Sequence, residues 1–180
     1  MINILFIGNS HTYYNDMPMM VRQLAVGDGY ECRVVMIAHG GWFLMQHVEE
    51  PDVRFNILYG GYDYVVLQEH AHPLAPEEQY VEALETLNSW IRKAGSIPVI
   101  YETWTKKDNP GAQEHKNAMY QRAAEKFGAL LAPVGETWWA YKESYPELEL
   151  YDPDGGHASP DGSAFAAKCI WETIREDLRK

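Results

Sequence analysis

The sequence predicts an α/β protein, a three-layer α/β/α sandwich around a five-stranded parallel sheet, with residues 1–180 forming a single domain. Short apolar runs alternate along the chain with longer helical segments, which is typical of parallel strands joined by right-handed helical crossovers. The apolar runs contain almost no alternating polar residues, and this indicates a sheet covered on both faces. A chain of 180 residues suits one such core and leaves little room for a second domain.

The first half of the chain predicts three strands separated by helices. A β-branched, apolar run begins at Ile2 and ends before Gly8, and two further runs have the same character. Pro18, close behind Asp16, indicates the start of the first helix, and Gly27 marks its end. The predicted strands are Ile2–Ile7, Cys32–Ile37 and Tyr64–Leu67, and the predicted helices cover residues 16–26, 44–47 and 53–58.

The second half predicts two more strands and four helices. Pro76 opens a strongly amphipathic helix that ends before Gly95. A polar loop rich in proline, glycine and aspartate precedes the last helix, for which Ser159, Asp161 and Ser163 are suitable caps. The predicted strands are Ile97–Tyr101 and Leu130–Val134, the predicted helices cover residues 76–94, 113–127, 136–144 and 163–179, and the loop covers residues 145–162.

Composition and charge argue against several classes of function. The net charge of −11 repels phosphate backbones and anionic lipid, so neither nucleic acid nor a membrane surface is an expected partner. No apolar stretch approaches the roughly 20 residues of a membrane span, and no basic segment precedes the first apolar run. Cys32 and Cys169 lie in no CxxC motif and are expected to be buried free thiols. We therefore expect a cytoplasmic protein.

A polar turn follows the first predicted strand and is a candidate for chemistry. In open parallel sheets, ligands bind beyond the carboxyl ends of the strands, and Ser10 stands there in the sequence GNSHT. A serine hydroxyl becomes a nucleophile when a histidine accepts its proton and a carboxylate orients that histidine. The segment DPDGGH supplies Asp154 and His157, with Asp152 as a rival carboxylate. The alternative is structural: Ser10 as a turn residue or N-cap, and Asp154-Gly-Gly as a tight turn.

Together these segments resemble the SGNH, or GDSL-type, hydrolases. The resemblance covers the whole chain in order: FIGNSHT near the N-terminus, glycines after the second strand, a polar residue after the third, and D-x-x-H before the last helix. Members of this family share a three-layer sandwich of flavodoxin-like topology and are mostly esterases. The resemblance implies that Ser10 is the nucleophile, His157 the general base and Asp154 the residue that orients His157. It implies no cofactor and a small-molecule acyl ester as substrate.

The resemblance also implies an oxyanion hole with three donors. Two are backbone N–H groups, one of Ser10 and one of a glycine after the second strand, for which Gly41 is preferred over Gly40. The third is an asparagine side chain after the third strand. Here Gln68 stands in that place, so the chain departs from the family pattern, although a glutamine amide can also donate.

Histidines and aromatic residues gather at the same edge of the predicted sheet. His11, His39, His70 and His72 are interpreted as pocket lining and not as a metal site, because no HExxH or paired helical histidine motif is present. The aromatic residues expected there are Tyr13, Tyr14, Trp42, Phe43, Trp104, Trp138 and Trp139, with one of the last two in the core. Trp42, His70 and Trp104 are the candidate substrate-binding residues, and a small acyl group, such as an acetyl group on a carbohydrate, is the expected substrate moiety.

Three alternatives remain open at the level of sequence. The same fold serves lysophospholipases and acyl-thioesterases. A phosphate-binding loop after the first strand would instead indicate an FMN-binding, flavodoxin-like module, which leaves Asp154 and His157 unexplained. The replacement of asparagine by Gln68 also leaves room for a non-catalytic protein that binds a ligand with this fold.

Overall fold

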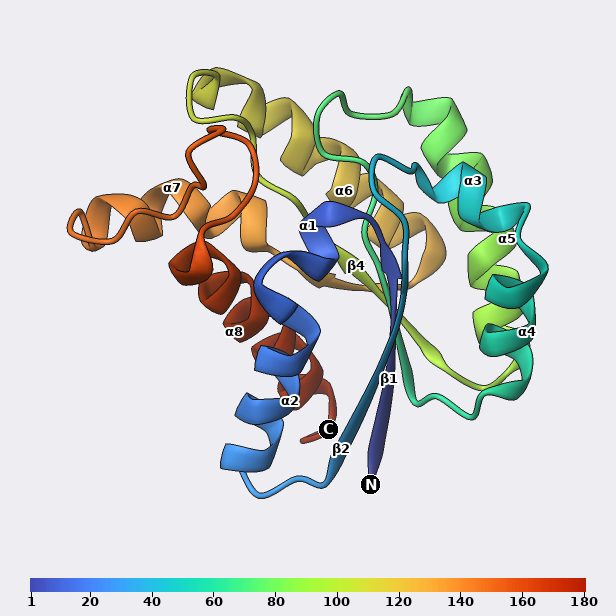
Figure 1. Ribbon diagram of the computed structural model, residues 1–180. Coiled ribbons are helices and arrows are strands. Elements are labelled where there is room, and N and C mark those ends of the chain that lie inside the picture. Colours follow the sequence, from blue (N-terminus) through green and yellow to red (C-terminus); the bar gives the residue numbers. More distant parts are fainter.

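The sheet has the predicted architecture. In the computed structural model, which describes residues 1–180, five strands are all parallel and lie in the order β2-β1-β3-β4-β5 (Figure 1). This order reverses beside β1, so the loops after β1 and β3 flank the point where ligands bind in such sheets. The strands are β1 (Ile2–Gly8), β2 (Cys32–Ala38), β3 (Tyr64–Leu67), β4 (Ile97–Tyr101) and β5 (Leu130–Ala132).

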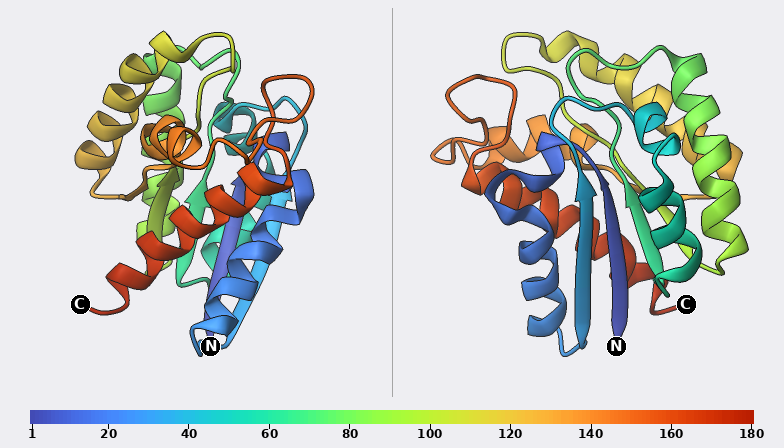
Figure 2. Two further views of the ribbon diagram at one scale, coloured as in Figure 1. Left: turned by 90° about the vertical axis from the view of Figure 1, so that its left-hand side faces the viewer. Right: turned by 45° about the vertical axis from the view of Figure 1, so that its right-hand side comes forward.

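Helices cover both faces of the sheet, which completes the three layers (Figure 2). One layer is formed by α2 (Met17–Gly27), α7 (Val134–Ser144) and α8 (Pro160–Asp177). The other layer is formed by α3 (Leu44–Val48), α4 (Pro51–Tyr59), α5 (Glu77–Lys93) and α6 (Gln113–Phe127). The short α1 (Ser10–Tyr13) and the 3₁₀ turns η1 (Tyr14–Asp16) and η2 (Pro110–Ala112) lie in the connections.

The core consists of two apolar layers, one on each face of the sheet. Along β1, Ile4 and Phe6 pack toward α2 and α8, whereas Leu5 and Ile7 pack toward α4 and α5. Successive side chains of a strand point to opposite faces, so a strand covered on both sides must be apolar at every position. This explains why the apolar runs in the sequence predicted the strands well.

Several element boundaries differ by one to three residues from the sequence-based expectation, and three differences bear on the candidate site. Residues 10–13 form α1, which was not predicted, and β5 ends at Ala132 because Val134 already begins α7. The last helix begins at Pro160, three residues earlier than expected, because the Ser159 side chain caps it by accepting a hydrogen bond from the Gly162 N–H. All three differences lie at the edge of the sheet that carries the candidate site.

The carboxyl ends of the strands meet at one edge of the sheet, with α1 and the loop before α8 above it, while both termini lie at the opposite edge (Figure 1). No helix is both long enough and apolar enough to cross a membrane. Cys32 and Cys169 are free thiols, of which Cys32 is buried and Cys169 is half-buried.

Candidate active site

The turn after β1 presents Ser10 at the carboxyl edge of the sheet. The Asn9 side-chain oxygen caps α1 by accepting a hydrogen bond from the His11 N–H at 3.0 Å, and the Asn9 amide nitrogen donates to the Trp42 carbonyl at 2.9 Å. Asn9 is buried, whereas Ser10, the first residue of α1, is half-buried. The short helix therefore fixes the backbone of Ser10 while its hydroxyl remains accessible.

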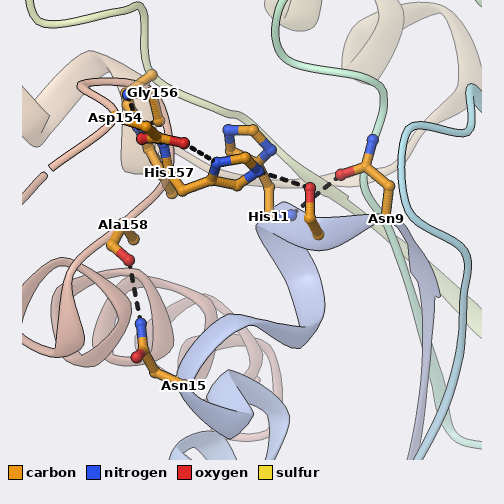
Figure 3. A network of polar contacts seen from close by, with 9 residues as sticks. Asn9, His11, Asn15, Asp154, Gly156, His157 and Ala158 are labelled. Atoms are coloured by element: carbon orange, nitrogen blue, oxygen red, sulfur yellow. Dashed lines mark hydrogen bonds and ion pairs between the residues drawn. The ribbon is translucent and has the colours of Figure 1, made fainter. Parts of the chain in front are cut away.

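A second asparagine links this turn to the segment that carries His157. Asn15 and Asp16 adopt left-handed backbone conformations, with φ of 56° and 55°, in the connection between α1 and α2. The Asn15 amide nitrogen donates to the Ala158 carbonyl at 3.0 Å and to Ser163 Oγ at 2.9 Å. Figure 3 shows the Asn15–Ala158 contact below the histidines. This contact joins two segments that lie more than 140 residues apart in the sequence.

Ser10, His157 and Asp154 form a continuous chain of hydrogen bonds. Ser10 Oγ lies 2.7 Å from His157 Nε2. His157 Nδ1 bonds to Asp154 Oδ2 (Figure 3). Asp154 Oδ1 accepts the backbone N–H groups of Gly156 at 2.8 Å and of His157 at 2.9 Å. The two glycines between Asp154 and His157 thus let one carboxylate bind both the ring and the backbone of the histidine. Asp152 makes no side-chain hydrogen bond to His157.

The surroundings of Asp154 favour its charged form. Burial by itself opposes ionisation, but the hydrogen bond from the His157 ring and those from the Gly156 and His157 N–H groups outweigh it and hold the pKa of Asp154 well below its ordinary value. A permanent carboxylate on Nδ1 keeps the Nδ1 proton in place. The lone pair of Nε2 then faces the Ser10 hydroxyl, as proton transfer from serine requires.

Two aromatic rings hold the His157 imidazole between them. Tyr14 stacks on one face with ring centroids 4.3 Å apart and an interplanar angle of 18°. The His11 ring lies next to the His157 ring (Figure 3), and the two ring centroids are 4.7 Å apart. His11 is buried, and burial together with the neighbouring His72 and His157 holds its pKa well below the ordinary value. A neutral His11 therefore acts here as a packing surface for His157.

Trp104 is not a substrate-binding residue, which corrects the expectation from the sequence. Its side chain is fully buried, and its ring stacks on Trp138 with centroids 3.9 Å apart and an interplanar angle of 9°. The indole N–H donates to the Gly156 carbonyl at 2.9 Å. Trp104 thus supports the loop between Asp154 and His157 from below. Trp138 is the core member of the Trp138–Trp139 pair, since Trp139 is only partly buried.

The loop after β2 lies beside the Ser10 turn. Gly41 has φ of +75°, a conformation that favours glycine, and a Cβ on Gly40 would lie only 2.9 Å from the Tyr13 hydroxyl. The Asn9 bond to the Trp42 carbonyl holds this loop against the turn. The backbone N–H groups of Ser10 and Gly41 donate to no acceptor within the protein.

Gln68 lies under the Ser10 turn and is buried. Its amide oxygen accepts the Asn9 N–H and the Thr12 hydroxyl, each at 2.8 Å, and its amide nitrogen donates to the Glu69 carbonyl. Gly8 is required at this point, because a Cβ there would lie 2.5 Å from the Gln68 amide oxygen. Gln68 therefore fixes the backbone on both sides of Ser10, and one N–H of its amide group remains without an acceptor.

The other predicted pocket residues form a half-buried rim. Trp42 packs on His39 with ring centroids 4.1 Å apart, and His70 stacks on Phe43 with centroids 4.4 Å apart. His70 Nδ1 donates to the Pro73 carbonyl at 2.7 Å. The histidines do not combine with cysteine or carboxylate side chains into a group of three that could hold a metal ion.

His47 anchors the Gly8 carbonyl and is expected to make stability depend on pH. Its Nε2 donates to that carbonyl at 2.9 Å, and burial lowers the pKa of His47 to about 4. An unfolded histidine has a pKa of about 6.5, so between pH 6.5 and pH 4 the unfolded state binds a proton that the folded state does not, and stability falls as pH falls.

The pair of proteins to compare is therefore wild type and His47→Gln, because glutamine can still donate to the Gly8 carbonyl but does not titrate. The shift from 6.5 to about 4 corresponds to about 3.5 kcal/mol in full, at about 1.4 kcal/mol per pKa unit. We therefore expect His47→Gln to lose about 2.4 kcal/mol less stability than wild type on going from pH 7 to pH 4.5. Urea unfolding at the two pH values measures this difference. Equal losses in the two proteins would contradict the prediction. His11, whose pKa is also lowered by burial, is present in both proteins, so its contribution to the pH dependence of stability cancels.

The sequence indicated Ser10, Asp154 and His157 but not the roles of the residues that hold them. Tyr14, Asn9 and Asn15 carry no motif of their own, and their roles depend on which side chains meet across the loops. The one available signal was the repeated asparagine and tyrosine content of the segment NSHTYYND. Asparagine is suited both to capping a helix and to the left-handed backbone that ends one.

Comparison with solved structures identifies the fold. A GDSL-like lipase from Parabacteroides merdae matches with a TM-score of 0.75 and 18% identity over 97% of this chain and 95% of its own. An acetyl xylan esterase matches with a TM-score of 0.75 and 15% identity over 96% of this chain and 100% of its own. The chain has the SGNH hydrolase fold. A carbohydrate esterase of family 3 from Talaromyces cellulolyticus has the same SGNH fold, with a TM-score of 0.81 and 11% identity over 99% of both chains.

The similarity lies in the fold and not in the sequence. No protein-family profile matches the sequence, and no curated protein does so. Identities of 11–18% show a shared architecture, so the chemistry of this chain has to be argued from its own residues.

Proposed function

We propose that this chain is a serine esterase that hydrolyses a carboxylic ester with Ser10 as nucleophile, His157 as general base and Asp154 as the residue that orients His157. The observation that carries the proposal is the 2.7 Å contact between Ser10 Oγ and His157 Nε2, with the Asp154 carboxylate on the other ring nitrogen. Nucleophile, base and orienting carboxylate in hydrogen-bond reach are the signature of serine hydrolases on unrelated folds. A flavodoxin-like cofactor site would have no use for this arrangement.

The reaction follows from these contacts in two stages. Ser10 Oγ attacks the ester carbonyl carbon while His157 Nε2 takes the hydroxyl proton, which gives a tetrahedral intermediate and an imidazolium ion held by Asp154. The imidazolium returns the proton to the leaving alcohol, and an acyl-enzyme on Ser10 remains. His157 then takes a proton from water, which attacks the acyl-enzyme, and the acid leaves as Ser10 regains its proton.

The negative charge on the carbonyl oxygen needs hydrogen-bond donors. We assign this role to the N–H groups of Ser10 and Gly41, which have no acceptor in the protein, and to the remaining amide N–H of Gln68. The Asn9 bond to the Trp42 carbonyl supports the assignment, since it keeps the Gly41 loop next to the Ser10 turn.

The role of Gln68 as a donor can be separated from its role in holding the turn. Gln68→Ala is expected to lower kcat by about 10²–10³-fold, as does loss of one oxyanion donor. In Gln68→Glu, burial favours the neutral carboxyl group, which can still accept from Asn9 and Thr12 and donate to the Glu69 carbonyl but has no further N–H.

We therefore expect Gln68→Glu to lose about as much of kcat as Gln68→Ala, provided that the two variants unfold at wild-type urea concentrations. A Gln68→Glu variant with wild-type kcat would show that Gln68 only fixes the turn. The assignment of Gln68 to the oxyanion hole would then be wrong.

The substrate class is proposed as an ester of a small acyl group, such as an acetyl group on a carbohydrate. Half-buried Trp42 and His70 at the rim offer flat faces on which a sugar ring can pack. Hydrolysis of p-nitrophenyl acetate and covalent labelling by a fluorophosphonate probe test the proposal, with Ser10→Ala as control. A panel of acetylated sugars, acyl-thioesters and lysophospholipids then distinguishes the substrate classes. Absence of both hydrolysis and labelling would indicate a ligand-binding protein without catalysis.

A further inference from the structure

A cavity of about 430 Å³ lies at the same edge of the sheet, next to the loop that carries His157. It is enclosed by the loop after β3, the loop after β4 and the first turn of α6, and both loops stand above the carboxyl ends of the strands in Figure 1. This volume is within the range of small-molecule sites. The mechanism proposed above makes no use of it.

Two lysines and two histidines line this cavity, although the chain as a whole is acidic. They are Lys106, Lys116, His72 and His115, and no aspartate or glutamate is among the lining residues. Burial and the two lysines lower the pKa of His72 to about 3, so the His72 ring is neutral and the positive charge comes from the lysines. The whole chain carries a net charge of −11, so this is a local reversal of sign. A concave surface lined by one sign of charge attracts a ligand of the opposite sign.

Lys116 is the least expected of these residues, because lysine is almost never buried without a partner. Its side chain is only 3% exposed, and Nζ donates to the carbonyls of Trp104 at 2.8 Å and of Ala71 at 3.1 Å. An ammonium group has three N–H donors, so one remains. Burial lowers the pKa of Lys116 to about 7, against the opposing effect of Glu102. An anion in the cavity would stabilise the charged form of Lys116.

The cavity and the reaction centre share a wall. A methyl group on Gly156, the residue before His157, would lie 3.5 Å from His72 Cδ2 and 4.0 Å from Lys106 Cε. The His72 ring lies 5.2 Å from the His11 ring, which in turn packs on His157. A substrate whose ester group lies at Ser10 would reach this cavity by extending past the Gly156–His157 segment.

We propose that this cavity is a subsite for an anionic group of the substrate, a carboxylate or a phosphate, carried on the part of the molecule away from the ester bond. This inference rests on the proposed esterase function, which it makes more specific. The same cationic groups would favour an acidic sugar ester over a neutral one.

The test compares esters that differ only in remote charge. 4-(Acetoxymethyl)benzoate, the corresponding phenylphosphonate and the neutral methyl ester of the benzoate carry the same acetyl group. We expect wild-type kcat/KM to be about tenfold higher for at least one of the anions than for the neutral ester, as one new charged hydrogen bond would give. The higher of the two anionic rates shows whether a carboxylate or a phosphate fits better.

The variants Lys106→Gln and His115→Gln should lower this preference several-fold, and they leave the buried Lys116 in place to avoid unfolding. Lys107→Gln is the matched control, because Lys107 pairs with Glu149 at 2.5 Å and does not line the cavity. It should leave the preference unchanged. Equal rates for all three esters, or a preference of full wild-type size in the Lys106→Gln/His115→Gln double variant, would overturn the subsite.

Binding measured without turnover separates this inference from the proposed function. NMR titration of Ser10→Ala with 4-(hydroxymethyl)benzoate should shift the amide signals of residues 71–74 and 105–116, and its neutral methyl ester should do so more weakly. If no ester is hydrolysed but the anion binds here, the esterase proposal fails and the subsite stands. If esters are hydrolysed but the anion causes no shifts at these residues, the subsite fails and the esterase proposal stands.

Discussion

Ser10→Ala and His157→Ala are each expected to lower kcat for p-nitrophenyl acetate by about 10⁶-fold, the loss typical when the nucleophile or the base of a serine hydrolase is removed. The 2.7 Å contact between Ser10 Oγ and His157 Nε2 makes the two side chains one functional unit. Without the imidazole the hydroxyl keeps its proton, and without the hydroxyl the imidazole has nothing to activate. Ser10→Ala should also abolish fluorophosphonate labelling.

The double variant gives the sharper test of this unit. Because neither residue works without the other, Ser10→Ala/His157→Ala should be about as slow as either single variant, and the two losses should not multiply. Ser144→Ala serves as the control for a serine change, because the Ser144 hydroxyl bonds only to the Ala140 carbonyl at the end of α7. Residual rates above one hundredth of wild type in either single variant would contradict the assignment.

Asp154→Asn is expected to lower kcat by about 10⁴-fold while leaving the fold intact. The asparagine oxygen can still accept the Gly156 and His157 N–H groups, but its NH₂ group would face His157 Nδ1. The imidazole would then carry its proton on Nε2 and could not accept one from Ser10. Asp154→Ala places no NH₂ group against His157 Nδ1. It should therefore lower kcat by less than His157→Ala does.

Asp152→Asn is the matched control for Asp154→Asn. Asp152 stands two residues away and was the rival carboxylate, yet only its backbone meets His157, with the Asp152 N–H donating to the His157 carbonyl at 2.9 Å. Its variant should keep kcat within a few-fold of wild type. Steady-state kinetics at pH 7 to 8, with urea unfolding of each variant, measure the effect apart from stability. A larger loss in Asp152→Asn than in Asp154→Asn would reverse the assignment of the carboxylate.

Where local sequence could predict structure, the reason was that one physical requirement dominated. The strand Ile2–Gly8 is buried on both faces, so almost every position had to be apolar, and the run could be recognised without knowledge of its neighbours. The start of α8 and the existence of α1 depended instead on single side-chain caps from Ser159 and Asn9. Many serines and asparagines could cap, and only the folded chain shows which ones do.

The candidate site also contains residues that local sequence could indicate and residues that only the folded chain reveals. Ser10 follows a strand and Asp154 stands three residues before His157, so the sequence by itself indicated the proposed nucleophile, base and carboxylate, because each has a local signature. Trp104 was misassigned because exposure is not a local property: the fold stacks its ring on Trp138 and turns its N–H to the Gly156 carbonyl.

The sequence alone therefore determined the architecture of this protein and the chemical groups at its sheet edge, because strand burial and side-chain chemistry are set residue by residue. Only the tertiary structure decided how those groups are held: Gln68 under the Ser10 turn, Tyr14 and His11 on either side of the His157 ring, and a buried Lys116 in a basic cavity. These contacts join loops from different strands, and their geometry exists only once the sheet has brought the loops together.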